Sequence, residues 1–216
     1  MKKIFLILIA IVIPCLETYS QTSKGVMDFL RSCKYEIIVG YNTNVSTEPF
    51  SEAKIGYNLG ITGRKEIATL KDDKIGVYGI VGLILTKRGG KIDNDFMTLL
   101  DDNKNLSISA LSVPMHVGGE YKFRKISLFA DLGPNALFVT GGGEMENLST
   151  SGVAFGGGFN IGIRFSKFAM SFGVDQDFTN LAKFTPDRDQ KDELELEKDK
   201  YNLKTSEFHF DLRWTF

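Results

Sequence analysis

The end of the chain alternates strictly between apolar and polar side chains. The apolar series is Phe208, Phe210, Leu212, Trp214 and Phe216, and it is separated by His209, Asp211, Arg213 and Thr215. Successive side chains of a β-strand point to opposite faces, so this pattern predicts a strand with one apolar and one polar face. Residues 152–165 and 168–179 alternate in the same way. A period of two, rather than 3.6, therefore governs the fold.

The same reading predicts eight strands along the chain. They cover residues 34–42, 54–68, 74–87, 105–123, 126–139, 152–165, 168–179 and 204–216. A tilted strand needs about nine to eleven residues to cross the hydrocarbon layer of a membrane, and globular strands are usually shorter. With 22 glycines and 17 phenylalanines but only 5 prolines, the composition favours an ordered β-rich chain over a disordered or collagen-like one.

The chemistry of the polar face distinguishes a membrane barrel from a soluble one. Glycine, serine and asparagine dominate this face, together with charges of both signs. Its charged members are Glu36, Glu120, Lys122, Asp131, Arg164, Asp175, Glu207, Asp211 and Arg213. Small residues beside charges that can pair fit the narrow lumen of a small barrel, which leaves the apolar face for lipid. A soluble sandwich with a polar outer face is the alternative.

Aromatic residues and connection lengths also favour the membrane. The apolar face is predicted to carry two aromatic girdles, one made by Tyr35, Tyr121, Phe123, Phe165, Phe168, Trp214 and Phe216 and the other by Tyr41, Tyr57, Phe138, Phe155, Phe178 and Phe208. Short turns at 71–74, 124–125 and 166–167 alternate with long loops at 43–53, 88–104, 140–151 and 180–203. The predicted fold is an all-β, eight-stranded antiparallel up-and-down transmembrane barrel with short periplasmic turns and long extracellular loops.

The first twenty residues have the features of a secretory signal peptide. Lys2 and Lys3 precede an apolar run, and Ser20 precedes the expected cleavage site before Gln21. A membrane anchor and a lipoprotein signal ending at Cys15 are the alternatives, but the run is short for a spanning helix. The predicted organisation is a signal peptide over 1–20 and an outer-membrane barrel domain over 21–216, with a short segment 21–33 before the barrel at 34–216. Cleavage would leave Cys33 as a lone thiol, better explained by packing than by reactivity.

Several short motifs resemble those of a known family. They are Ile55 to Gly60 (IGYNLG), Leu85 to Gly90 (LTKRGG), Leu111 to Met115 (LSVPM), Tyr121 to Phe123, Gly133-Pro134 and the terminal Phe216. Across the whole mature chain their order and spacing resemble the PorT-like outer-membrane β-barrel family, small porin-like barrels of Gram-negative bacteria. The resemblance implies an outer-membrane location and transfers no catalytic residue. The ending also resembles the aromatic C-terminal signal read by the barrel-assembly machinery.

No motif of established chemistry accompanies this pattern. The two histidines, His116 and His209, fall on the polar face without a nucleophile motif such as G-x-S-x-G or a zinc spacing such as H-E-x-x-H. The charged block at 183–200 lacks the glycine and distant glutamate of a calcium loop. With a net charge of −1, the chain lacks the excess of positive charge that attracts the phosphates of nucleic acid. We therefore predict no enzyme, no cofactor, no metal site and no nucleic-acid partner.

The leading functional hypothesis is an integral outer-membrane protein with a structural, binding or secretion-associated role carried by its surface loops. Its expected partners are outer-membrane lipid, the barrel-assembly machinery through the strand ending in Phe216, and a protein partner at loops 88–104 and 180–203. A narrow porin and a lipid-modifying enzyme that uses a histidine are the alternatives. An eight-stranded barrel leaves an interior only wide enough for side chains.

The lumen carries the one candidate site. Glu36, Glu120, Arg164 and Arg213 are expected to form a single neutralising cluster, because an unpaired charge in a narrow lumen is costly. Glu36 and Arg213 become neighbours only if the first and last strands pair. Lys54 is the expected counter-charge for Asp175 and Glu207 at the loop end.

Overall fold

A computed structural model describes residues 32–47, 53–70, 74–91, 105–142, 148–185 and 200–216. The chain divides into two units, Met1–Lys34 and Tyr35–Phe216, and the second is the barrel. The predicted signal peptide 1–20 and most of segment 21–33 lie outside the described residues. Among the described residues, no helix combines the length and apolar character needed to cross a membrane.

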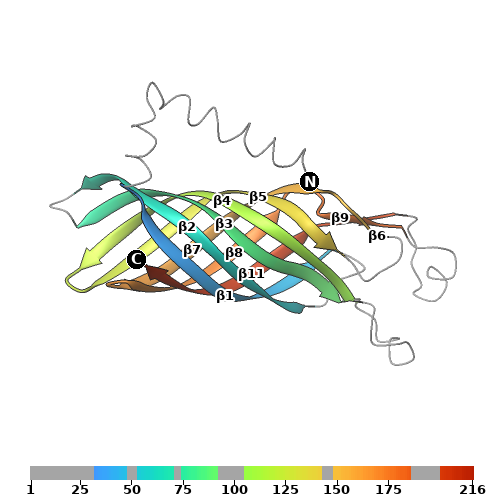
Figure 1. The fold of residues 1–216 in the computed structure, drawn as a ribbon, viewed down its shortest axis with the longest axis horizontal. Helices are drawn as coiled ribbons and strands as arrows, with labels where there is room; N and C mark the ends of the chain where they lie inside the picture. Colours follow the sequence, from blue (N-terminus) through green and yellow to red (C-terminus); the bar gives the residue numbers. More distant parts are fainter. Residues whose placement is uncertain (1–31, 48–52, 71–73, 92–104, 143–147, 186–199) are drawn as a thin grey trace, which may run out of the picture. The chain divides into compact units, whose positions relative to one another are not determined.

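Eight antiparallel strands form a closed barrel, as the sequence predicts (Figure 1). Their bounds are β1 (Lys34–Ser46), β2 (Lys54–Leu70), β3 (Ile75–Lys91), β4 (Asn105–Phe123), β5 (Ile126–Gly142), β7 (Val153–Phe165), β8 (Phe168–Asp177) and β11 (Thr205–Thr215). Each strand pairs with its sequence neighbours in the barrel, and β1 pairs with β11 to complete the ring. In that seam Glu36 lies opposite Thr215 and Ile38 lies opposite Arg213.

The connections at the two ends of the barrel differ. At the turn end, β4 joins β5 through Arg124-Lys125, and β7 joins β8 through Ser166-Lys167. Arg124 and Ser166 adopt positive φ angles of 41° and 55°, which allow the chain to reverse within two residues. At the opposite end, the loop end, a second sheet is formed by β6 (Leu148–Thr150), β9 (Ala182–Phe184) and β10 (Tyr201–Leu203). The sequence reading assigned these residues to loops, because strands this short show no periodicity.

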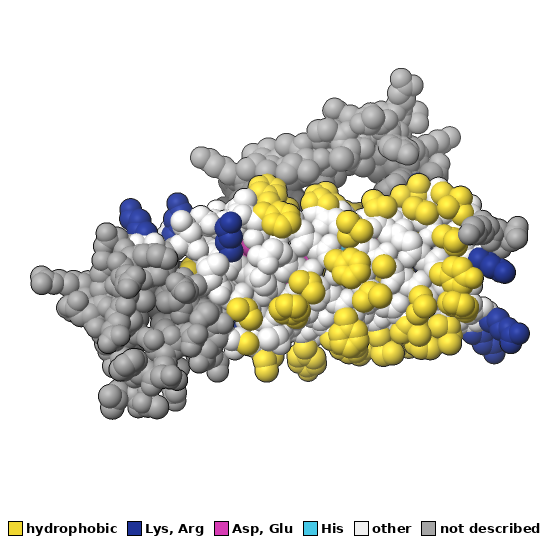
Figure 2. Space-filling view, turned by 180° about the vertical axis from the view of Figure 1, so that it is seen from behind, with side chains coloured by type: hydrophobic (Ala, Val, Ile, Leu, Met, Phe, Trp, Pro, Cys, Tyr) yellow, Lys and Arg dark blue, Asp and Glu magenta, His cyan; other side chains and the backbone are white. Residues whose placement is uncertain are grey.

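The barrel is apolar outside and polar inside. Among the described residues, 32 large hydrophobic side chains are exposed while 23 polar or charged residues are buried, the reverse of a water-soluble domain. Figure 2 shows the apolar side chains spread over the barrel wall between its two ends. Glu36 and Arg213 are 0% and 5% exposed, so both belong to the inward face as predicted.

The aromatic side chains confirm most of the predicted girdles. At the turn end Tyr121, Phe123, Phe165, Phe168, Trp214 and Phe216 are exposed, and toward the loop end Tyr41, Tyr57, Phe155, Phe178 and Phe208 are exposed. Phe168 and Trp214 stack with ring centroids 5.7 Å apart. The prediction for Phe138 was wrong, because its side chain is only 5% exposed.

Candidate functional site

Inward-facing glycines make room for the polar lumen. A Cβ at Gly40 would collide with the Asp211 carboxylate, and a Cβ at Gly173 would collide with both His209 and Asn160. A small barrel has too little internal volume for a side chain at every inward position. Glycine on one strand therefore lets a long side chain from the next strand reach the centre of the barrel.

A first set of charges lies near the turn end. This turn-end layer consists of Glu36, Arg64, Glu120, Ser127 and Arg164. The Arg164 guanidinium places Nη2 2.7 Å from Glu36 Oε1 and Nε 3.4 Å from Glu120 Oε1. Glu120 also accepts hydrogen bonds from Arg64 and from the Ser127 hydroxyl. Two guanidiniums and two carboxylates are thus combined in a buried and neutral layer.

Aromatic rings separate this layer from the next one. The guanidinium carbon of Arg64 lies 3.9 Å from the centre of the buried Tyr78 ring. Those of Arg164 and Arg213 lie 5.4 Å and 5.5 Å from the centre of the Phe129 ring. Cation–π contacts of this kind stabilise a desolvated guanidinium without a further carboxylate.

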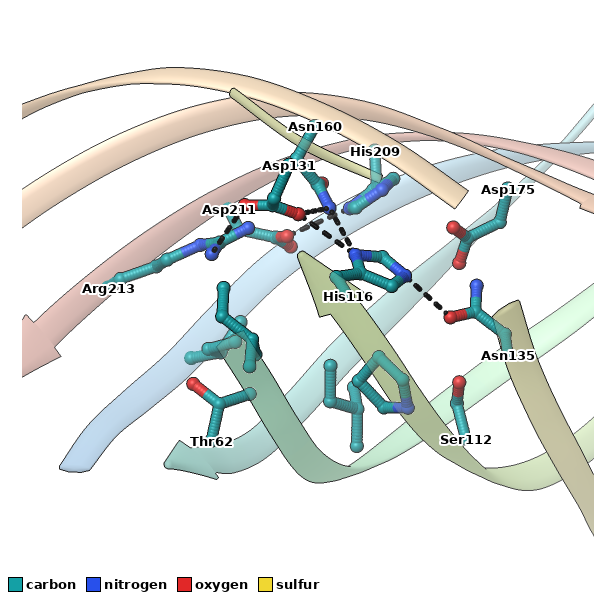
Figure 3. A pocket seen from close by; sticks show the side chains of 14 residues that line it. Thr62, Ser112, His116, Asp131, Asn135, Asn160, Asp175, His209, Asp211 and Arg213 are labelled. Atoms are coloured by element: carbon teal, nitrogen blue, oxygen red, sulfur yellow. Dashed lines mark hydrogen bonds and ion pairs between the residues drawn. The ribbon is translucent and has the colours of Figure 1, made fainter. Parts of the chain in front are cut away.

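The second set, which we call the middle layer, consists of His116, Asp131, Asn135, Asn160 and Arg213 (Figure 3). His116 Nδ1 lies 2.9 Å from Asp131 Oδ1, and its Nε2 lies 2.8 Å from Asn135 Oδ1. Asn160 donates to the same Asp131 oxygen over 2.8 Å. Arg213 Nη1 is 4.0 Å from Asp131 Oδ2, so Asp131 has donors or cations on both carboxylate oxygens.

The third set, the loop-end layer, is organised by Arg88 and contains Asp175, Asp177 and Glu207. The guanidinium lies 2.8 Å from Asp177 through Nη1, 3.1 Å from Asp175 through Nη2 and 2.8 Å from Glu207 through Nε. Asn58 donates to the second Glu207 oxygen over 2.8 Å. The Arg88 side chain is 1% exposed, so one buried cation holds three carboxylates.

A cavity of about 30 Å³ lies between the middle and loop-end layers. Its lining includes Thr62, Ser112 and His116, and on the loop side Asp175 and His209. This volume is enough for only a few water molecules. It offers no space for a sugar, a nucleotide or a lipid chain.

The lumen divides the four residues of the predicted cluster between two layers. Arg164 joins Glu36 and Glu120 in the turn-end layer. Arg213 instead pairs with Asp131 and donates from Nε to Ser171 Oγ over 3.1 Å. The cation that completes the turn-end layer is Arg64, which the sequence reading did not single out.

The prediction of a counter-charge at the loop end missed the principal cation. Arg88 faces Asp175 and Glu207. The predicted third strand ended at residue 87, which placed Arg88 in a loop. The inward series Ile84, Thr86 and Arg88 continues the alternation by one step, and this signal would have identified Arg88.

The two histidines serve the hydrogen-bond network of the lumen. His209 Nδ1 lies 2.8 Å from Asp211 Oδ2, and His116 pairs with Asp131. Ser112 lines the same cavity as His116. Within the described ranges, no three His, Cys, Asp or Glu side chains gather into a group that could hold a metal ion.

Comparisons with known proteins add the following. No family model matches the chain, and no curated protein matches it. It is similar to the outer membrane protein OprG from Pseudomonas aeruginosa at 12% identity, with a TM-score of 0.48, 86% of this chain and 96% of OprG covered. It is similar to the outer membrane enzyme PagL at 12% identity and a TM-score of 0.44, covering 81% and 97% of the two chains. For Ail, the attachment invasion locus protein of Yersinia pestis, the identity is 14%, the TM-score 0.39 and the coverage 86% and 99%.

Proposed function

We propose that the protein is an integral outer-membrane barrel with a closed lumen, and that its role is structural, binding or secretion-associated. The reversed distribution of apolar and polar side chains carries this proposal. Exposed side chains such as Leu83 and Phe172, which are 52% and 65% exposed, would be unfavourable in water and are favourable in lipid. The resemblance to PorT-like barrels agrees with this role.

A closed lumen argues against a diffusion pore. The turn-end, middle and loop-end layers each cross the interior, and the cavity between two of them measures only about 30 Å³. A solute would have to break ion pairs such as that of Arg88 with Asp177 to pass. We expect little or no stable conductance in planar bilayers, and a reproducible large open state would restore the porin alternative.

The position of the histidines argues against a lipid-modifying enzyme. His116 is 4% exposed and its ring contacts Asp131 and Asn135 inside the barrel. Lipid contacts the opposite face of the wall, so an acyl ester could not reach the imidazole. Replacing His116 with alanine should leave the lipid profile of the outer membrane unchanged.

The loop end is the region that we assign to partner binding. The predicted loops 88–104 and 180–203 are the longest connections in the sequence, and we propose them as the surface for a protein partner. The first begins after Lys91, where β3 ends, and the second contains β9 and β10. Residues 92–104 and 186–199 lie outside the described residues. The last strand, ending in Phe216, is the proposed contact for the barrel-assembly machinery. Crosslinking from the second loop and identification of the captured protein would test this assignment.

A charge on the outward face tests the membrane location. Leu83→Arg should reduce the amount of folded barrel strongly, because a charge near the bilayer midplane costs about 2–4 kcal/mol. Ser149→Arg, on an exposed position of the loop-end sheet, is the matched control and should have little effect. The readouts are membrane fractionation and the heat-dependent shift in gel mobility. If both variants gave the same amount of folded protein and both fractionated with the soluble periplasm, the proposal would be contradicted.

A further inference from the structure

Basic side chains form a rim around part of the turn end. This basic rim consists of Lys74, Lys122, Arg124, Lys125 and Lys167. Four of them are exposed. Lys122 continues the inward series of β4 and lies at the open end of the lumen, where its side chain is 40% exposed. Figure 2 shows Lys and Arg side chains at this end, beyond the apolar wall, and others at the loop end.

Strand pairing makes the rim continuous. The Lys122 amide donates to the Lys74 carbonyl over 2.8 Å, which joins the start of β3 to the end of β4. Ile126 pairs with Phe165, so the turn that contains Arg124 and Lys125 lies beside the turn that contains Lys167. The rim therefore follows neighbouring strands from β3 to β8.

Few acidic side chains oppose these cations. Among the described side chains of this end, Glu66 is the exposed acidic one, and it lies 3.7 Å from Lys122. The α-carboxylate of Phe216 lies at the same end, because the neighbouring Thr215 amide donates to the Lys167 carbonyl over 2.8 Å. Asp72 and Asp73 belong to the β2–β3 connection and lie outside the described residues. The part of the rim made by Arg124, Lys125 and Lys167 thus combines three cations in two adjacent turns.

The rim adjoins the aromatic girdle of the turn end. Phe123 and Phe165 directly precede the two turns, and Phe168 follows the second one. Trp214 pairs with Phe168 and is 51% exposed. Aromatic side chains of this kind lie at the level of lipid headgroups, so the cations just beyond them lie where the phosphates are.

We propose that the basic rim binds the headgroups of anionic phospholipids in the leaflet that surrounds the turn end. This proposal rests on the membrane location proposed above. Lysine and arginine beside an interface attract anionic lipid electrostatically, and the attraction decreases with ionic strength. The turn end of the barrel would therefore be surrounded by a lipid shell richer in anionic lipid than the bulk bilayer.

The single tryptophan of the chain provides a local probe. The full barrel would be reconstituted into phosphatidylcholine vesicles that contain about a third phosphatidylglycerol, in two preparations. Bromine quenches tryptophan fluorescence on contact. One preparation would contain brominated phosphatidylglycerol, and the other would contain an equal fraction of brominated phosphatidylcholine. Comparing the two preparations reports which lipid lies against Trp214.

We expect brominated phosphatidylglycerol to quench Trp214 about twofold more than an equal fraction of brominated phosphatidylcholine at low salt. The ratio of quenching by the two brominated lipids should fall toward one at about 0.5 M salt, where the electrostatic screening length is short. The triple variant R124Q/K125Q/K167Q should lose the preference. The triple variant K87Q/K183Q/K204Q, which removes three cations from the loop end, should keep it.

The possible failures of the two proposals are distinguishable. If neither brominated lipid quenches Trp214, the chain is not inserted and the proposed membrane location is wrong. If both lipids quench equally at low salt, the barrel is inserted but the rim does not select anionic headgroups. If the loop-end variant loses the preference and the turn-end variant keeps it, the basic rim is not the binding surface.

Discussion

The two ends of the lumen neutralise their buried carboxylates with different numbers of cations. In the turn-end layer, Arg64 and Arg164 face Glu36 and Glu120, so cations and carboxylates are equal in number. In the loop-end layer, Arg88 alone faces three carboxylates. Arginine can do this because its planar guanidinium presents five N–H donors in a fixed fork. The turn-end layer distributes its stability over two cations, whereas the loop-end layer depends on one.

Arg88→Ala should therefore have the largest effect of any single lumenal substitution. It leaves three buried carboxylates without a cation, and breaking a buried ion pair from one side costs about 3–5 kcal/mol. The free energy of unfolding would be measured by urea titration of the folded barrel in detergent. Lys87→Ala, at the outward-facing neighbour, is the matched control and should change stability little. Equal effects of the two substitutions would show that the loop-end layer does not depend on Arg88.

Arg213→Ala should have an intermediate effect of about 2 kcal/mol. Asp131 loses a cation but keeps its contacts with His116 and Asn160. We expect a larger loss than for Lys191→Ala, which removes a charge from the predicted loop 180–203 outside the described residues. The same urea titration would compare the three variants, and a loss for Arg213→Ala as large as that for Arg88→Ala would contradict this ranking.

The close packing of the wall can be tested separately from the charges. Gly133→Ala would place a Cβ against the backbone of Met115 and His116, which cannot move as a side chain can. Forcing an extra carbon into such a site costs about 1–3 kcal/mol. Gly119→Ala is the matched control, because its Cβ would meet nothing within 4 Å. If both substitutions were neutral, the inward glycines would not be required for space.

The smallest effect is expected for removal of one negative charge from the loop-end layer, where three carboxylates surround one cation. Asp175→Asn should change stability by less than about 1 kcal/mol, because Arg88 keeps two carboxylates and the neighbouring negative charge falls. Asp177→Asn should cost more, since Asp177 also accepts hydrogen bonds from the Thr205 amide and hydroxyl over 3.0 Å and 2.6 Å. Equal costs would mean that the layer needs all its negative charge.

The alternation of side chains was sufficient to predict the eight barrel strands and most of their inward faces. The predicted strand at 105–123 has the observed bounds of β4, and the inward positions of Glu36 and Arg213 are confirmed. Alternation is a local property that each strand carries in its own sequence. The fold was therefore accessible without knowledge of any contact between strands.

The pairing of charges was less accessible, because it depends on how neighbouring strands slide past one another. A shift of register moves an inward side chain along the barrel axis and changes its partners. Arg213 reaches Asp131 on β5 and not Glu36 on the adjacent strand β1. A long arginine side chain can also contact partners at a different level along the barrel axis. The position of a residue within its own strand does not reveal such contacts.

The position of Arg88 has a consequence for the order in which the barrel is assembled. Its partners Asp175 and Asp177 follow it by 87 and 89 residues, and they lie on β8, which is not adjacent to β3 in the sheet. A partly formed wall that lacks β8 and β11 would hold this guanidinium in the barrel interior with no carboxylate beside it. A partial wall made of the first strands alone is therefore unfavourable. Closure of the seam and neutralisation of the interior are therefore expected to occur as one cooperative event.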